Sequence, residues 1–244
     1  MNSTIIQSPD VCLNESTQKP LDKLVDNLQN EFSKLQPEGY YGHSETISEL
    51  LNNYINNCDD WKEYVFYCPF RYTRNLIART DQFELMVICW RKDQPSPIHN
   101  HEDQRCWMGC VNGKLQETYF VYKSTKSTYG CGELEKSYVH PIDNGSVGYI
   151  TDEIAFHMME SIEDESVSIH LYSKPITECN IYCPITGTVS RRKLGYFTQY
   201  KQKVQCNTAQ PQAQPQAQPQ AQPTNPVLTT PPTTTLNSNI LNVN

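Results

Sequence analysis

The chain has 244 residues, ten of them cysteines, and a formal net charge of −7 at pH 7. This length suits one sizeable domain, and the acidic balance argues against a nucleic-acid-binding protein. No apolar run reaches the roughly 18 residues of a membrane span, and no secretory signal is visible at the N-terminus, so we expect a cytoplasmic protein with reduced cysteines.

The first predicted elements are two amphipathic helices, which follow a polar, flexible N-terminus at residues 1–19. Apolar residues recur at helical spacing between Leu21 and Leu35, and again between Ile47 and Ile55. Each run gives a helix with one apolar stripe, which is typical of a helix that packs against the body of a domain.

Short strands are predicted to dominate the chain after about residue 65. The clearest are expected at residues 83–90, 115–122, 148–151 and 167–172, separated by turns rich in Gly, Asn, Asp and Pro. Helices followed by many short strands predict an α+β fold that is mainly β, with a barrel or a sandwich. This domain is predicted to span residues 20–204.

The C-terminal segment, residues 205–244, is predicted to be a disordered tail. No residue from Asn207 to Asn244 is charged, and a Gln-Pro-Gln-Ala repeat is followed by a stretch rich in Thr, Pro and Asn. Such a composition cannot bury enough apolar surface to offset the entropy lost on ordering. A passive tail is favoured over a Pro-rich segment that binds a partner.

Three histidines carry most of the chemical information in the sequence. His99 and His101 are two residues apart, so on a strand their imidazoles would point to the same face. A third imidazole, from His157, would complete one side of a metal's coordination shell and leave the other side open, as a catalytic metal requires. Ligand type alone does not separate iron, zinc, copper and manganese, and the alternative is a set of structural histidines.

The strand at residues 167–172 has two chemically different faces. One face carries the apolar residues Val167, Ile169 and Leu171, and the other carries Ser168, His170 and Tyr172. The polar face could form the wall of a pocket or could meet solvent, and the pattern alone leaves both interpretations open.

Several motifs together resemble a known family. The block from Pro97 to Phe120 resembles the first metal motif of the cupin superfamily, His-x-His followed by a glycine, with Cys106 where a glutamate is usual. With the segments 70–75, 88–90 and 168–173, the chain closely resembles eukaryotic cysteine dioxygenases from about residue 21 to residue 201. The resemblance implies a cupin-type β-barrel, or jelly roll, with N-terminal helices.

The resemblance also implies roles for individual residues. His99, His101 and His157 match the ligands of an Fe(2+) cofactor. Arg74 matches the arginine that binds the substrate carboxylate, and Tyr72 matches a neighbouring pocket tyrosine. Cys106 and Tyr172 match a pair that is joined by a thioether cross-link. A relay behind the metal ligands is matched by Ser168, His170 and Tyr172.

The activity implied by the resemblance is oxidation of the L-cysteine thiol by O2 to cysteine sulfinic acid, the first step of cysteine catabolism, by a monomer. Related dioxygenases of 3-mercaptopropionate or cysteamine are alternatives, and Arg74 argues against both. A non-catalytic cupin is the alternative from another class, and the full set of matched residues argues against it. The sequence departs from the mammalian pattern at Lys174, where a proline is usual, and from the second cupin motif at Ser161, where an asparagine is usual.

Overall fold

The computed structural model describes residues 18–34, 45–123 and 132–204. Most of the predicted flexible N-terminus and the whole predicted tail at 205–244 lie outside these ranges. The helices are α1 (Pro20–Ser33), α2 (Glu45–Asn57) and the short 3-10 helix η1 (Asp60–Tyr64). The strands are β1 (Thr73–Arg79), β2 (Glu84–Arg91), β3 (Ile98–His99), β4 (Cys106–Asn112), β5 (Lys114–Tyr122), β6 (Leu134–Asp143), β7 (Val147–Ile150), β8 (Phe156–Ser161), β9 (Glu165–Tyr172), β10 (Glu178–Tyr182), β11 (Val189–Lys193), β12 (Thr198–Gln199) and β13 (Gln202–Lys203).

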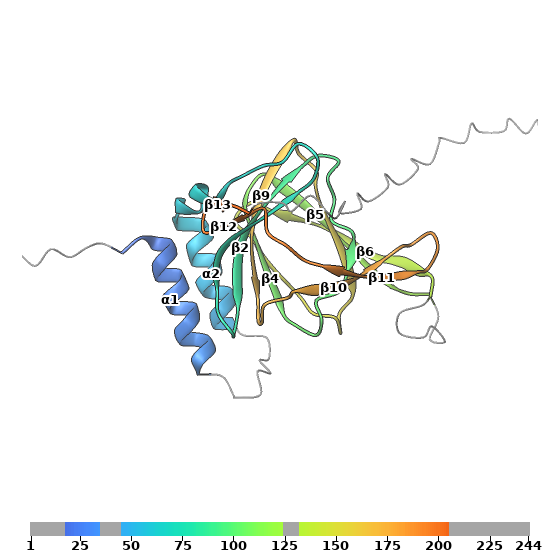
Figure 1. Cartoon of the computed structure of the whole chain (residues 1–244), viewed down its shortest axis with the longest axis horizontal. Coiled ribbons are helices and arrows are strands. Elements are labelled where there is room, and N and C mark those ends of the chain that lie inside the picture. Colours follow the sequence, from blue (N-terminus) through green and yellow to red (C-terminus); the bar gives the residue numbers. More distant parts are fainter. Residues whose placement is uncertain (1–17, 35–44, 124–131, 205–244) are drawn as a thin grey trace, which may run out of the picture.

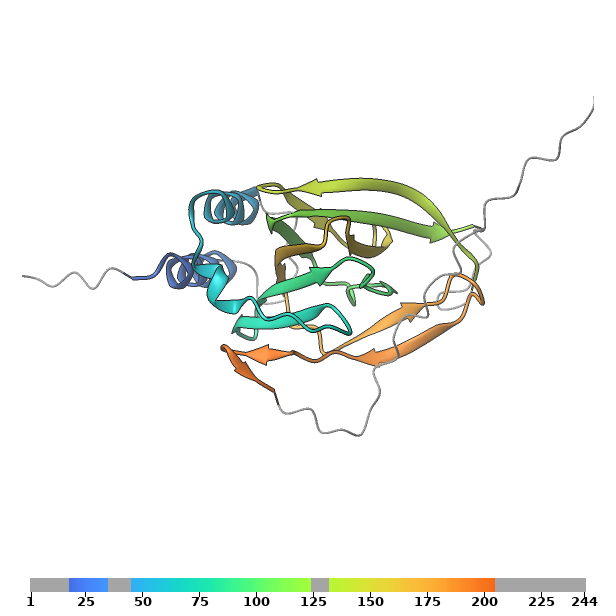
Figure 2. The same ribbon diagram turned by 90° about the horizontal axis from the view of Figure 1, so that it is seen from above.

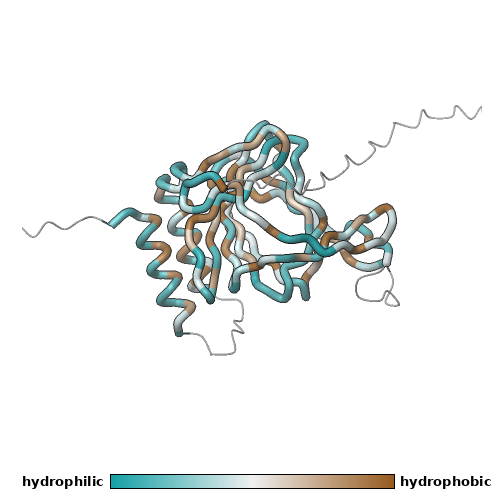
Figure 3. Tube along the Cα trace, viewed as in Figure 1, coloured by the Kyte–Doolittle hydropathy of each residue, from teal (hydrophilic) through white to brown (hydrophobic). Residues whose placement is uncertain are grey.

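The two helices lie side by side against one sheet (Figures 1 and 2). Pro20 occupies the first turn of α1, where its missing N–H costs nothing. The buried side chains of α1 recur every three or four residues, and α2 follows the same pattern. Figure 3 shows the resulting alternation of hydrophobic and hydrophilic residues along α1. Neither helix has the length and apolar character of a membrane-crossing helix.

The strands form two sheets. One has seven strands in the order β13-β12-β1-β2-β9-β4-β7, and the other has six in the order β11-β10-β3-β8-β5-β6. Strands β1 and β12 run parallel, whereas the pairs at the centre of each sheet are antiparallel. The predicted mainly β fold with N-terminal helices is confirmed, although the described strands make two sheets and no closed barrel.

Strand β9 separates two hydrophobic cores. Val167, Ile169 and Leu171 are buried in the core that the helices form with the seven-stranded sheet. The opposite face carries Ser168, His170 and Tyr172, all buried, on the side of a second core that joins residues of both sheets. The pocket interpretation of this strand is therefore confirmed over the solvent interpretation.

The turn between β4 and β5 depends on Gly113. Its φ angle is +74°, and a Cβ atom there would lie 2.5 Å from Ser166 Oγ and 2.7 Å from the Glu165 carbonyl oxygen. We predict that Gly113→Ala lowers the free energy of unfolding by about 2 kcal/mol or more, because it combines an unfavourable backbone conformation with a clash. Urea denaturation measures this, with Gly195→Ala as the control because a Cβ there meets nothing within 4 Å. Equal stability of the two variants would contradict the prediction.

Candidate metal centre and active site

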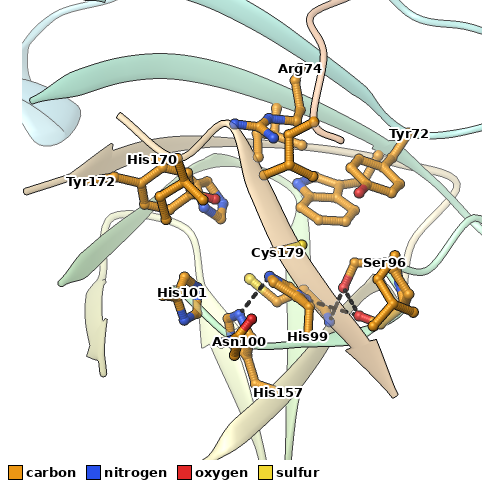
Figure 4. Close-up of a pocket in the computed structure, with 17 residues that line it drawn as sticks. Tyr72, Arg74, Ser96, His99, Asn100, His101, His157, His170, Tyr172 and Cys179 are labelled. Atoms are coloured by element: carbon orange, nitrogen blue, oxygen red, sulfur yellow. Dashed lines mark hydrogen bonds between the residues drawn. The ribbon is translucent and has the colours of Figure 1, made fainter. Parts of the chain in front are cut away.

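A buried pocket lies on the polar side of β9 (Figure 4). Every site residue expected from the sequence lines it, except Cys106 and Ser168, which are buried and contact the lining residue His170. The residues with reactive or polar side chains that line it are Tyr72, Arg74, Ser96, His99, Asn100, His101, His157, His170, Tyr172 and Cys179.

The three expected histidines meet on one side of this pocket. His99 ends β3 and is the register partner of His157 on β8, while His101 follows β3 directly. One ring nitrogen from each residue lies within 4.8 Å of the others. The structure thus assembles the predicted group from two neighbouring strands and the turn after one of them.

Two of the imidazoles direct bare nitrogen atoms at each other. His99 Nδ1 lies 2.9 Å from the Pro97 carbonyl oxygen, and His157 Nδ1 lies 2.5 Å from Glu117 Oε1, so each Nδ1 is assigned the proton. Burial and the neighbouring histidines lower the pKa of both rings well below the usual value, which keeps them neutral. The two Nε2 atoms, 3.2 Å apart, then face each other with lone pairs. Such an arrangement is favourable with a cation between them, so it fits a metal site.

His101 adds a second sign of a metal site. The residue is buried, yet neither ring nitrogen has a hydrogen-bond partner in the part of the chain that the structure describes. Asp152 Oδ1 accepts the His101 backbone N–H at 2.6 Å and lies 3.7 Å from Nδ1. A buried nitrogen without a partner is costly unless it has a ligand, which makes His101 a suitable third ligand.

Sequence reasoning missed the carboxylate that orients His157. Glu117 on β5 is fully buried and also lies 3.1 Å from Nε2 of His140. Burial raises the pKa of Glu117 to about 7, although the charge of His140 opposes this shift. Partners of this kind fix the tautomer and orientation of a ligating imidazole. The signal in the sequence was a charged residue inside a predicted strand.

Cys106 and Tyr172 are direct register partners on the adjacent strands β4 and β9. Directly opposed residues have Cβ atoms about 5 Å apart, and both side chains here are buried. Burial raises the pKa of the Cys106 thiol and of the Tyr172 phenol well above their usual values. No cysteine within the described ranges, Cys106 included, forms a disulfide.

A hydrogen-bonded chain supports the ring of His170. The Trp90 indole N–H donates to Ser168 Oγ at 2.8 Å, and His170 Nε2 lies 2.9 Å from the same oxygen. If the serine O–H donates to Nε2, Nδ1 carries the proton and faces Cys106 Sγ at 3.9 Å. The ring of His170 meets the ring of Tyr172 edge-on, with centroids 6.3 Å apart.

Arg74 enters the pocket from β1, opposite the histidine group (Figure 4). Its Nη2 donates to Glu84 Oε1 at 3.1 Å, and its Nε lies 3.3 Å from Met86 Sδ. Tyr72 stacks on Trp90 with a centroid distance of 4.9 Å. The expected substrate-binding residues therefore share the pocket with the histidines, while Glu84 was not expected from the sequence.

The two departures noted in the sequence are accommodated locally. The described backbone contains no cis peptide bond, so the turn at Lys174 is trans throughout. Ser161 Oγ lies 2.7 Å from Ser166 Oγ and donates to the Glu163 carbonyl oxygen at 2.7 Å. Neither residue lines the pocket.

Comparison with known proteins matches most of the described chain to one family. The family model "Cysteine dioxygenase type I" matches residues 30–184. Cysteine dioxygenase type 1 of Danio rerio is 30% identical over 162 residues, which cover 65% of this chain and 79% of that protein. The Bos taurus protein of the same name is 30% identical over 168 residues, or 68% and 82% of the two chains. The Homo sapiens protein is 29% identical over 159 residues, or 64% and 78%.

Solved structures similar to the chain include an RmlC-like cupin protein from Desulfovibrio desulfuricans. Its TM-score is 0.36 at 17% sequence identity, over 49% of this chain and 98% of that one.

Proposed function

Because the chain belongs to the cysteine dioxygenase type I family, we propose that it oxidises the thiol of L-cysteine with O2 to cysteine sulfinic acid in the pocket described above. The observation that carries this proposal is one buried pocket with three converging imidazoles on one side and the Arg74 guanidinium on the other. The first group suits a metal and the second suits a carboxylate, and L-cysteine offers a thiol, an amine and a carboxylate in one small molecule.

The cofactor in this proposal is Fe(2+), held by His99, His101 and His157. The family implies a metal cofactor, and the facing lone pairs and the unpartnered His101 nitrogen support a cation at this place. Bound iron would supply a site that ligates the substrate thiolate and activates O2. Three neutral ligands would leave the 2+ charge of the ion uncompensated, which favours the anionic form of a thiol whose free pKa is about 8.5.

The protein side chains orient the substrate in this proposal. Arg74 binds the carboxylate with its planar fork of donors, and Tyr72 borders the same part of the pocket. Tyr172, buried between Arg74 and His101, would present its hydroxyl to the substrate. The relay of Ser168 and His170 fixes the wall beside it.

The overall reaction balances without a further reductant. Both atoms of O2 are added to the sulfur, so the thiol RSH becomes the sulfinic acid RSO2H. The sulfur atom gives up four electrons and O2 accepts them, with the thiol proton retained in the product or released to solvent.

The test is aerobic turnover of the iron-loaded full chain with L-cysteine, cysteamine and 3-mercaptopropionate in parallel, with the sulfinates detected by mass spectrometry. Cysteine sulfinate as the main product supports the proposal. Preference for another thiol would preserve the metal chemistry but contradict the role of Arg74. Sulfinate from none of them, with iron bound, would favour a non-catalytic cupin.

We further propose that Cys106 and Tyr172 form a thioether cross-link, in which the S–H and a ring C–H are replaced by an S–C bond and O2 accepts the two hydrogens. Active protein should then have an intact mass lacking two hydrogens, and Cys106→Ala should restore the full mass. Because the ring of Tyr172 loses its restraint, the variant should also lower the rate between about 10- and 100-fold. Cys110→Ala, at another buried cysteine of β4, is the matched control. Full mass in fully active protein would contradict the cross-link.

The cytoplasmic location, the monomeric state and the limits of the domain at residues 20–204 stay predictions from the sequence.

A further inference from the structure

A buried carboxylate lies behind Arg74 and outside the pocket. Glu84, at the start of β2, has no exposed surface. Its Oε1 accepts hydrogen bonds from Arg74 Nη2 at 3.1 Å and from the backbone N–H of Ile176 at 3.3 Å. Its Oε2 accepts the hydroxyl of Tyr196 and lies 3.8 Å from Arg79 Nη1. Every oxygen of this carboxylate therefore has two partners.

These contacts join three separate segments around one guanidinium. Arg74 belongs to β1, Ile176 lies in the segment after β9 and lines the pocket, and Tyr196 follows β11. The Tyr196 ring also lies 5.4 Å from Arg74 Cζ, and its hydroxyl accepts a hydrogen bond from Arg79 Nη1 at 2.8 Å. Burial, together with Glu84, raises the pKa of Tyr196, so its hydroxyl stays protonated and donates to the carboxylate.

The charges of this group suit an anionic substrate. One carboxylate between the guanidinium groups of Arg74 and Arg79 leaves one net positive charge, which matches one substrate carboxylate. A buried guanidinium without a counter-ion would be costly when the pocket holds no substrate. Glu84 pairs with Nη2, and no hydrogen bond from Nη1 is found among the described residues, so that group can bind a substrate.

Resting on the proposed function, we propose that Glu84 is a positioning residue: it holds the guanidinium of Arg74, with support from Tyr196, in the orientation that binds the substrate carboxylate. Glu84 and Tyr196 do not line the pocket, so they act through Arg74 and not by contact with substrate. In this role, Glu84 affects how the carboxylate end of the substrate binds and does not take part in the chemistry at sulfur.

The test compares Glu84→Ala with Glu84→Gln in the iron-loaded full chain. Alanine removes the acceptor of Nη2, so KM for L-cysteine should rise about tenfold, while kcat stays within about threefold of wild type. Glutamine keeps an acceptor oxygen for Arg74 and Ile176, so it should return KM to within about threefold of wild type. The matched control is Glu165→Ala. This variant removes another carboxylate that is paired with an arginine, Arg91, across strands β9 and β2 and outside the pocket.

The outcomes separate this inference from the proposed function. Unchanged KM in Glu84→Ala, or a loss of kcat alone, overturns the role of Glu84 and leaves the dioxygenase proposal intact. If Glu84→Ala does not fold, Tyr196→Phe provides the same test, with a rise in KM of about threefold expected and an unchanged KM contradicting the role. Absence of cysteine sulfinate from wild-type protein removes both proposals.

Discussion

Replacing His157 with alanine should release the metal and lower turnover of L-cysteine by more than about 100-fold, because even partners outside the ligand set cost about 10- to 100-fold when they are lost. The variant leaves His99 without the facing imidazole that now lies 3.2 Å away, and it removes one of the two histidines that contact Glu117. Two nitrogen ligands cannot hold the ion as three do. The iron content per chain, measured by mass spectrometry after gel filtration, and the rate of sulfinate formation check this.

The matched control for this experiment is Met158→Leu. Met158 is the next residue of β8, but it belongs to a different buried cluster that does not line the pocket. Its iron content and rate should stay near those of wild type. Full iron content and full activity in His157→Ala would remove His157 from the ligand set.

Glu117→Gln should give an intermediate loss of metal affinity, because the tautomer of His157 would no longer be fixed by a carboxylate.

Replacing Arg74 with glutamine should raise KM for L-cysteine about 100-fold. Charge-assisted hydrogen bonds to a buried carboxylate contribute up to about 3 kcal/mol, which corresponds to a factor of roughly 100 in affinity. Glutamine has neither the charge nor the fork of donors. The KM of Arg74→Lys should lie between the values for wild type and Arg74→Gln, since an ammonium keeps the charge but loses the planar geometry.

Arg74→Gln also removes the main ion-pair partner of the Glu84 carboxylate, which can lower the stability of the protein. Glu84 is fully buried, and without Arg74 only Arg79 remains as its charged neighbour. The double variant Arg74→Gln with Glu84→Gln removes both charges, so it separates loss of substrate binding from loss of stability. Thermal unfolding reports the stability of each protein, and Arg91→Gln is the control for an arginine of the same sheet. A normal KM in a stable double variant would contradict the role of Arg74.

Much of the fold could be predicted because the information is local. The apolar stripes of α1 and α2 and the alternation along β9 are periodic in the sequence, and the elements form where those periods occur. The pairing of His99 and His101 at i and i+2 was likewise a local signal, although the second histidine lies just beyond the two-residue strand β3. Whether the strands close into one barrel or form two sheets depends on their pairing, and periodicity does not contain it.

The parts of the site that were missed depend on contacts between distant segments. Glu84 is the first residue of β2 and stands directly before an apolar run, and Glu117 lies among polar and aromatic residues on β5. Each is tolerated because a partner arrives from elsewhere in the chain: Arg74 for Glu84, and His157 with His140 for Glu117. Burial of a carboxylate is visible only after the register is known, so the sequence marked these residues as anomalies without explaining them.

The two-faced strand β9 has a consequence for how natural variants of this protein should be read. Alternate residues of one continuous segment belong either to the helix-side core or to the reactive pocket. Insertion or deletion of a single amino acid between Ser168 and Tyr172 would turn the residues on one side of the change to the opposite face, so that Ser168, His170 and Tyr172 would no longer share the pocket side. A substitution changes one position, whereas a length change between Ser168 and Tyr172 breaks the shared polar face, so we expect it to abolish the activity.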